Sequence, residues 1–193
     1  MTSRWAVDIA LDRNLTIHWR SISLLLKNDM QPDSPWYPKA RKTHELLRVF
    51  ESVRAAQGEG ALGDGALGAL YTAYGRRIHH DQNLDFDAVE ALTEAGIDVS
   101  HARAATDESW DKVIRAQMDE GLALTGQDVG TPILGFTNEA GTKVGFFGPV
   151  ISRRLSHDDG LKLWDGIVLT AGIDSFWELK RTRTETPEFG ERP

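Results

Sequence analysis

The spacing of apolar residues along the chain changes from a period of two to a helical period and back again. Residues 15–22 alternate and are rich in β-branched and aromatic side chains, which predicts a β-strand. Residues 39–126 carry apolar side chains at every third or fourth position, which predicts helices. Two short β-forming runs, 132–136 and 144–148, flank turn residues at 138–141 and predict a β-hairpin.

Capping residues and glycines set the expected limits of the helices. The pattern predicts helices at residues 3–11, 40–57, 66–79, 85–95, 108–124 and 156–172. Asp85 is expected to cap the fourth of these, and Ser156 with Asp159 has the spacing of a capping box. The glycine-rich stretch 58–65 lacks the Gly-Lys-Ser/Thr of a phosphate-binding loop, so we expect a flexible loop between two helices.

Prolines mark two segments that should not form regular structure. Pro32, Pro35 and Pro38 lie within seven residues, so 31–38 is expected to be a loop at the rim of a site. Pro132 opens the first strand of the hairpin, where a missing N–H is tolerated only at a strand end or in a specialised loop. Thr131-Pro132 is therefore the place where a functional backbone conformation is expected.

Composition excludes several classes of function. The chain has 22 Lys and Arg residues against 29 Asp and Glu, a net charge of −7, which leaves no broad basic surface for nucleic acid or an anionic membrane. It has no signal peptide pattern and no apolar run of about 18 residues, so we expect a cytoplasmic protein. With no cysteine, the chain itself cannot supply a disulfide, a thiolate metal site or a cysteine nucleophile.

The histidines offer two candidate sites that the residues around them argue against. His79, His80 and Asp81 are consecutive, and adjacent side chains on a helix point in different directions, so a solvated helix end is favoured over a metal site. His18 lies in the predicted strand 15–22, where a structural role is favoured over that of a ligand or base. We expect no metal site.

Several motifs together resemble one family of redox proteins. The residues that carry the likeness are Val129-Gly130-Thr131-Pro132, Leu70 to His79, Phe146-Phe147-Gly148-Pro149, Leu163-Trp164-Asp165 and Glu178 to Glu185. They resemble the DsbA-like thioredoxin-fold oxidoreductases, typified by the mycothiol-dependent nitroreductases. The resemblance implies a cis Thr131–Pro132 bond that faces a redox dithiol. It also implies mycothiol or a similar small thiol as co-substrate, and a small-molecule or disulfide substrate.

The same resemblance implies an α/β domain interrupted by helices. Residues 1–31 and 129–193 would form a thioredoxin-like part, and 32–128 a helical insertion. Gly130, Thr131 and Pro132 would contact substrate, and Asn28 and Tyr37 are further candidates near the proline-rich loop. The alternative for that loop is structural: Trp36 and Tyr37 would pin it to the core.

The family's Cys-Pro-Trp-Cys motif, and the central strand before it, are expected upstream of Met1. That strand would separate 15–22 from 132–136, and without it these two would lie about 9–10 Å apart, twice the spacing of paired strands, or collapse together. We therefore expect Met1 to be an internal methionine of a longer oxidoreductase. Two other functions stay open: a redox-inactive binding module, or a relative of the kappa-class glutathione transferases and chromene-carboxylate isomerases. Residues 70–73 and 181–185 favour the nitroreductase branch.

Overall fold

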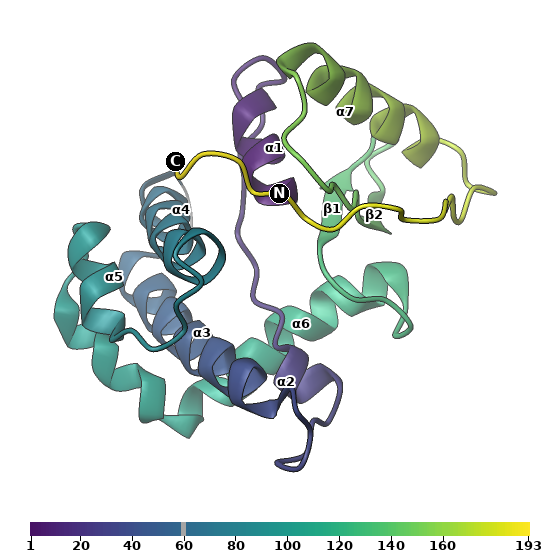
Figure 1. Ribbon diagram of the computed structural model, residues 1–193. Coiled ribbons are helices and arrows are strands. Elements are labelled where there is room, and N and C mark those ends of the chain that lie inside the picture. The colour runs from purple at the N-terminus through teal and green to yellow at the C-terminus, as the bar shows by residue number, and fades with distance from the viewer. Residues whose placement is uncertain (59–60) are drawn as a thin grey trace. The chain divides into compact units, whose positions relative to one another are not determined.

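The computed structural model describes residues 1–58 and 61–193, which divide into two compact units (Figure 1). An α/β unit contains residues 1–17 and 121–190, and a helical unit contains 18–120 and 191–193. Residues 18–31 thus lie in the helical unit, whereas the resemblance implies an α/β part that includes all of residues 1–31.

A hairpin and two helices form most of the α/β unit. Helix α1 spans Thr2–Ile9, strands β1 and β2 span Ile133–Thr137 and Lys143–Phe147, and helix α7 spans His157–Ala171. The strands pair antiparallel, with Ile133 opposite Phe147 and Thr137 opposite Lys143. Asn138 closes the turn by bonding to Thr142. The hairpin predicted from the sequence is confirmed.

Helix α7 begins as its sequence predicts. Ser156 is the N-cap, and its hydroxyl accepts a hydrogen bond from the backbone N–H of Asp159 at 3.2 Å. Helix α7 then packs on α1, where Trp5 and Ile9 are buried. The Trp5 indole N–H donates to the Gly160 carbonyl at 2.9 Å. The ring centroids of Trp164 and Phe136 of β1 lie 5.6 Å apart. Helix α7 therefore joins α1 to the hairpin.

Close contact at Gly160 gives a first prediction. A Cβ atom there would lie 3.2 Å from both Ile9 Cγ2 and Trp5 Cδ1, whereas a Cβ at Gly166 of the same helix would meet nothing within 4 Å. We expect Gly160→Ala to lower the free energy of unfolding by about 1 kcal/mol through overpacking. Gly166→Ala should raise it by about 0.5–1 kcal/mol, because alanine favours a helix interior over glycine. Urea unfolding of both variants measures this, and equal shifts would contradict the packing of α1 on α7.

The helical unit is built around α3 and α4. Its elements are α2 (Leu24–Lys27), α3 (Tyr37–Gln57), α4 (Ala61–Gly75), the π-helical turn η1 (Arg76–His80), α5 (Ala88–Glu94), the 3₁₀ helices η2 (Val99–Thr106) and η3 (Glu108–Trp110), and the first part of α6 (Asp111–Thr125). Helix α3 packs against α2, α4 and η2, and α5 packs against α4 and η2. Leu67, Leu70, Val49, Val53 and Leu92 lie at the centre of the core, each almost fully buried.

The prediction of a strand at residues 15–22 is wrong. These residues are extended, but in the described part of the chain only β1 and β2 form a sheet. Polar groups of the segment bind side chains of α3 instead: the Ser21 hydroxyl donates to Glu51 at 2.5 Å, and Arg54 donates to the Trp19 carbonyl at 2.5 Å. This anchoring explains why residues 18–22 belong to the helical unit.

Two further details differ from the sequence pattern. Helix α4 begins at Ala61, so residues 61–65 are helical rather than part of a loop, and 59–60 lie outside the described residues. Helix α5 is capped by Asp87, whose carboxylate accepts from the Val89 N–H at 2.9 Å. Asp85 lies in the preceding turn, where its own N–H donates to Asn83. Asp87 is the cap because its side chain reaches the first turn of α5.

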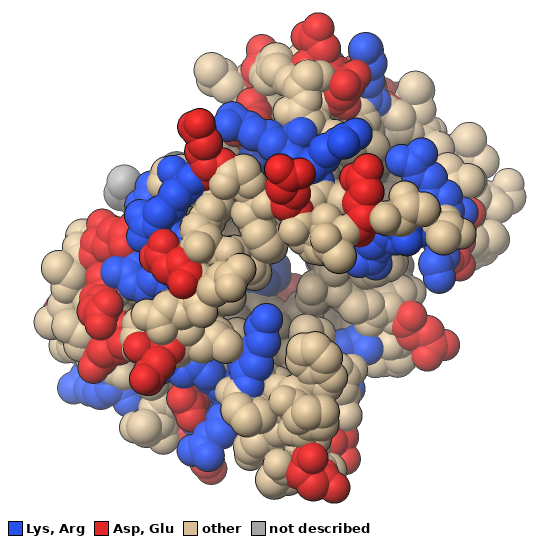
Figure 2. Space-filling model, viewed as in Figure 1, with Lys and Arg blue, Asp and Glu red and all other residues tan. Residues whose placement is uncertain are grey.

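Positive and negative side chains are mixed on the face of the molecule that Figure 2 shows. Figure 2 shows lysine and arginine side chains interspersed with aspartate and glutamate over the face drawn. Among the helices of the described residues, none is long and apolar enough to cross a membrane.

Candidate functional site

The loop at Thr131–Pro132 is attached to the end of the hairpin. The Thr131–Pro132 peptide bond is cis, and Gly148–Pro149 is cis as well. The Gly148 N–H donates to the Pro132 carbonyl at 2.8 Å. These two residues directly adjoin Ile133 and Phe147, which are paired across the two strands. Gly130 is partly buried, and a Cβ there would lie 4.0 Å from the Phe147 ring. Thr131 is exposed.

The N-terminus of α1 is held at the same end of the hairpin. The Thr2 hydroxyl donates to the Pro149 carbonyl at 2.6 Å. Since Pro149 follows Gly148, two hydrogen bonds connect the first turn of α1 to Pro132. Met1 occupies the N-cap position without a side-chain cap bond, and no acidic residue lies in the first turn. The positive end of the helix dipole is thus not offset by an acidic residue there, which suits a thiolate or another anion.

Asn28 and Tyr37 lie in the helical unit. Asn28 ends α2 and is exposed, whereas Tyr37 begins α3 and is half-buried. Trp36 is 67% exposed. The interpretation in which Trp36 pins the loop to the core is therefore wrong.

A histidine and an aspartate form a pair that the sequence pattern did not indicate. His18 Nδ1 lies 2.7 Å from Asp64 Oδ2, with the imidazole half exposed and the carboxylate nearly buried. Next to His18 in the sequence, Trp19 stacks on Tyr71 with ring centroids 5.2 Å apart. The carboxylate fixes the orientation of the imidazole and ties residue 18 to α4. We assign the pair a structural role.

Ser23, His44 and Asp111 have the residue types of a hydrolase triad. His44 Nδ1 lies 2.9 Å from the Ser23 hydroxyl, and His44 Nε2 lies 3.1 Å from Asp111 Oδ1. Ser23 is only 1% exposed and His44 only 3%, so no substrate carbonyl could reach the hydroxyl. The Ser23 oxygen also accepts from the Leu26 N–H as the N-cap of α2. The triad is therefore a buried structural network.

Acid should weaken this network. Burial lowers the pKa of His44, despite the attraction of Asp111 for the imidazolium. Burial opposes the charge on Asp111 as well, but hydrogen bonds from Arg48 lower its pKa overall. Because the folded state disfavours protonated His44, the unfolded chain binds more protons as the pH falls below the usual histidine pKa of about 6.5.

We therefore expect stability to decrease as the pH falls from about 6.5 to the lowered pKa of His44, and to level off for this group below that value. Urea unfolding across this range measures the effect. His44→Gln should remove the histidine part of the dependence, whereas His157→Gln, at a half-exposed position of the other unit, should retain it. An unchanged pH dependence in His44→Gln would contradict the assignment.

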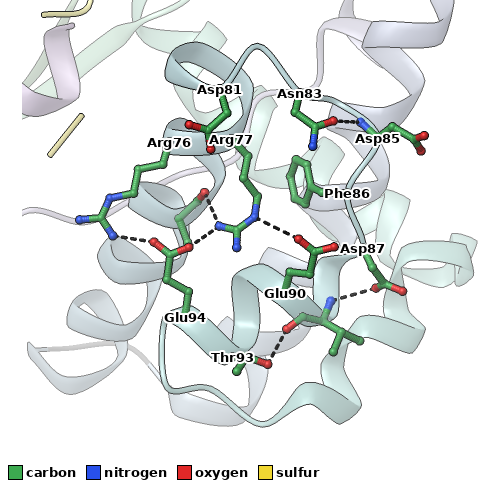
Figure 3. A network of polar contacts seen from close by, with 12 residues as sticks. Arg76, Arg77, Asp81, Asn83, Asp85, Phe86, Asp87, Glu90, Thr93 and Glu94 are labelled. Carbon is green, nitrogen blue, oxygen red and sulfur yellow. Dashed lines mark hydrogen bonds and ion pairs between the residues drawn. The ribbon is translucent and has the colours of Figure 1, made fainter. Parts of the chain in front are cut away.

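A second polar network joins η1 to α5 (Figure 3). Arg76 and Arg77 both donate to the carboxylate of Glu94, and the Arg77 guanidinium also lies 5.5 Å over the Phe86 ring. Asp81 at the end of η1 accepts two hydrogen bonds from Arg192, at 2.9 and 3.1 Å. The arginines are therefore engaged in structural contacts within the helical unit.

These units define a mixed α/β protein that is mostly helical, has a small two-stranded sheet, and carries an X-Pro loop tied to a helix N-terminus. The model of the Rv2466c-like family, described as mycothiol-dependent nitroreductase Rv2466c, matches residues 1–181. The chain belongs to this family, in agreement with the resemblance found in the sequence.

Proposed function

We propose that this chain serves thiol–disulfide chemistry of the DsbA type, with mycothiol as the small thiol. The observation that carries the proposal is the pair of hydrogen bonds, Gly148 to Pro132 and Thr2 to Pro149, that connects the N-terminus of α1 to the Thr131–Pro132 loop. Family membership supports mycothiol as the co-substrate.

The chemistry would take place at the N-terminus of α1. In thiol–disulfide exchange a thiolate attacks one sulfur of a disulfide, and the other sulfur leaves as a thiolate. A helix N-terminus stabilises the attacking thiolate and so increases its population at neutral pH. The chain contains no cysteine, so its own residues would bind and orient the reactants. We assign this role to Gly130, Thr131 and Pro132, and propose Asn28 and Tyr37 as substrate contacts on the helical unit.

A second candidate is a redox-inactive binding module. The absence of cysteine from all 193 residues favours it, because the module would keep the Thr131–Pro132 loop as a platform for a thiol or peptide without any exchange step. Binding of mycothiol is common to both candidates, so the experiment must also test reactivity at α1.

The first experiment measures binding. The chain is titrated with mycothiol and with glutathione by calorimetry, and the affected amides are located by NMR. We expect mycothiol to bind more tightly, with shifts concentrated at residues 130–132. Thr131→Ala should weaken binding, while Thr137→Ala, another exposed threonine at the far end of β1, should not. Equal affinity for both thiols, or equal effects of both variants, would count against mycothiol at this loop.

The second experiment measures reactivity. Ser3→Cys places a thiol in the first turn of α1, and Val7→Cys places one in an exposed position farther along the same helix. We expect the cysteine at position 3 to have the lower thiol pKa and to form a mixed disulfide with mycothiol disulfide faster, after correction for its thiolate fraction. Equal corrected rates would overturn the exchange site and leave the binding module.

A further inference from the structure

The α/β unit contains a cavity that neither the family match nor the proposed function explains. It has a volume of about 180 Å³ and lies between α1 and the segment that leads into α7. Trp5 and Ile9, both buried, contribute apolar surface to it. Ser156 and Gly160 line it from the first turn of α7.

Among the charged residues that line the cavity, arginines outnumber carboxylates. The lining residues include Arg4, Arg153, Arg154 and His157, whereas Asp8 is the one residue among them with a side-chain carboxylate. In a chain with a net charge of −7, this local excess of positive charge runs against the overall balance. Guanidinium groups are well suited to bind carboxylate or phosphate oxygens through paired hydrogen bonds.

The ion pairs around the cavity are long. Arg154 Nη2 lies 3.6 Å from Asp8, and Arg153 Nη1 lies 3.8 Å from Glu185. Both distances exceed the 2.7–2.9 Å that is typical of a charge-assisted hydrogen bond. In the same unit, Arg13 binds both oxygens of Asp165 at 2.7 and 2.8 Å, so tight pairing does occur where an arginine has a matched carboxylate. Arg153 and Arg154 therefore keep donor capacity for a ligand.

The N-terminal end of α7 adds to the positive potential of the cavity. Helix α7 has 15 residues, and its N-terminal turn faces the cavity through Ser156, His157 and Gly160. The positive end of the helix dipole attracts an anion placed there. Asp158 and Asp159 do not line the cavity, but they lie in the first turn of α7 and partly offset the positive end of the helix dipole.

We propose that this cavity binds the phosphate or carboxylate group of a small molecule, with Arg153 and Arg154 as the principal donors and the apolar surface of Trp5 and Ile9 in contact with the carbon skeleton. Met1 and Arg4, at the N-terminal end of α1, also line the cavity. Anion binding requires no thiol, so it is tested separately from the proposed redox function.

The test is calorimetric titration of the full chain with inorganic phosphate and with acetate, at constant ionic strength and with chloride as the control anion. The double variant Arg153→Gln/Arg154→Gln should bind the preferred anion at least about tenfold more weakly. The matched control, Arg181→Gln/Arg183→Gln, removes the same charge from exposed positions outside the cavity and should change the affinity by less than about twofold.

A further variant is expected to change the affinity in the opposite direction. Asp8→Asn removes the carboxylate that competes for Arg154, so it should bind the anion several-fold more tightly. Far-ultraviolet circular dichroism checks that the variants fold, which we expect because the Arg153 and Arg154 side chains are 69% and 76% exposed.

The preferred anion distinguishes a phosphate group from a carboxylate group as the natural ligand. The proposal is overturned if neither anion binds more tightly than chloride, if both double variants weaken binding equally, or if Asp8→Asn has no effect. NMR shifts confined to residues outside 4–9 and 151–160 would also overturn it.

Discussion

Replacing Glu51 by alanine is expected to lower the free energy of unfolding by about 3–5 kcal/mol, the cost of leaving a buried charge without its partner. Glu51 is 1% exposed and accepts from the Ser21 hydroxyl at 2.5 Å and from Arg54 Nε at 2.9 Å. Without it, the Arg54 guanidinium, 7% exposed, would keep only its bond to the Trp19 carbonyl among these contacts. Urea unfolding followed by circular dichroism measures the loss.

Two control variants separate this effect from a general loss of charge on α3. Glu45→Ala removes a carboxylate from the same helix, but its partner Arg41 is 63% exposed, so we expect a change of about 0.5 kcal/mol or less. Glu51→Met combined with Arg54→Met removes both buried charges and should cost less than Glu51→Ala alone, since no unpaired charge remains. A larger loss in the double variant would contradict this account.

Replacing Gly145 by alanine is expected to lower the free energy of unfolding by about 2–3 kcal/mol, near the upper end of the usual overpacking cost. Gly145 of β2 lies opposite Gly135 of β1, and Leu124 of α6 covers the pair. A Cβ at Gly145 would lie 2.8 Å from Leu124 Cβ and 3.2 Å from the Leu134 carbonyl oxygen. Neither atom can move without a shift of the backbone.

Gly135→Ala provides the matched comparison. Its Cβ would also come within 2.8 Å of Leu124, but of the mobile Cδ1 atom, so we expect a cost of about 1 kcal/mol. Leu124→Ala removes Cδ1 and keeps Cβ. In that background the cost of Gly135→Ala should vanish, while that of Gly145→Ala should largely persist. Equal rescue of both variants, measured by urea unfolding, would contradict the placement of Leu124 on the hairpin.

The sequence by itself determined the elements whose signals are local. The hairpin followed from two β-forming runs on either side of a turn, and Asn138 makes the expected turn contacts. The start of α7 followed from Ser156, whose cap bond reaches only three residues ahead. The Thr131–Pro132 loop was located by a proline at the start of a strand. In each case the residues that decide the conformation are neighbours in the chain.

The tertiary structure decided the conformation wherever the interacting residues are far apart in the sequence. Alternation in residues 15–22 fits a strand and an extended segment equally well, and the difference lies in Glu51 and Arg54, about 30 residues away, which bind the backbone and side chains of the segment. The bond from Thr2 to Pro149 spans 147 residues. The anion cavity likewise combines α1 with residues 151–160. Hydrogen bonds between such distant residues leave no periodic pattern in the sequence, so only packing of the folded chain could reveal them.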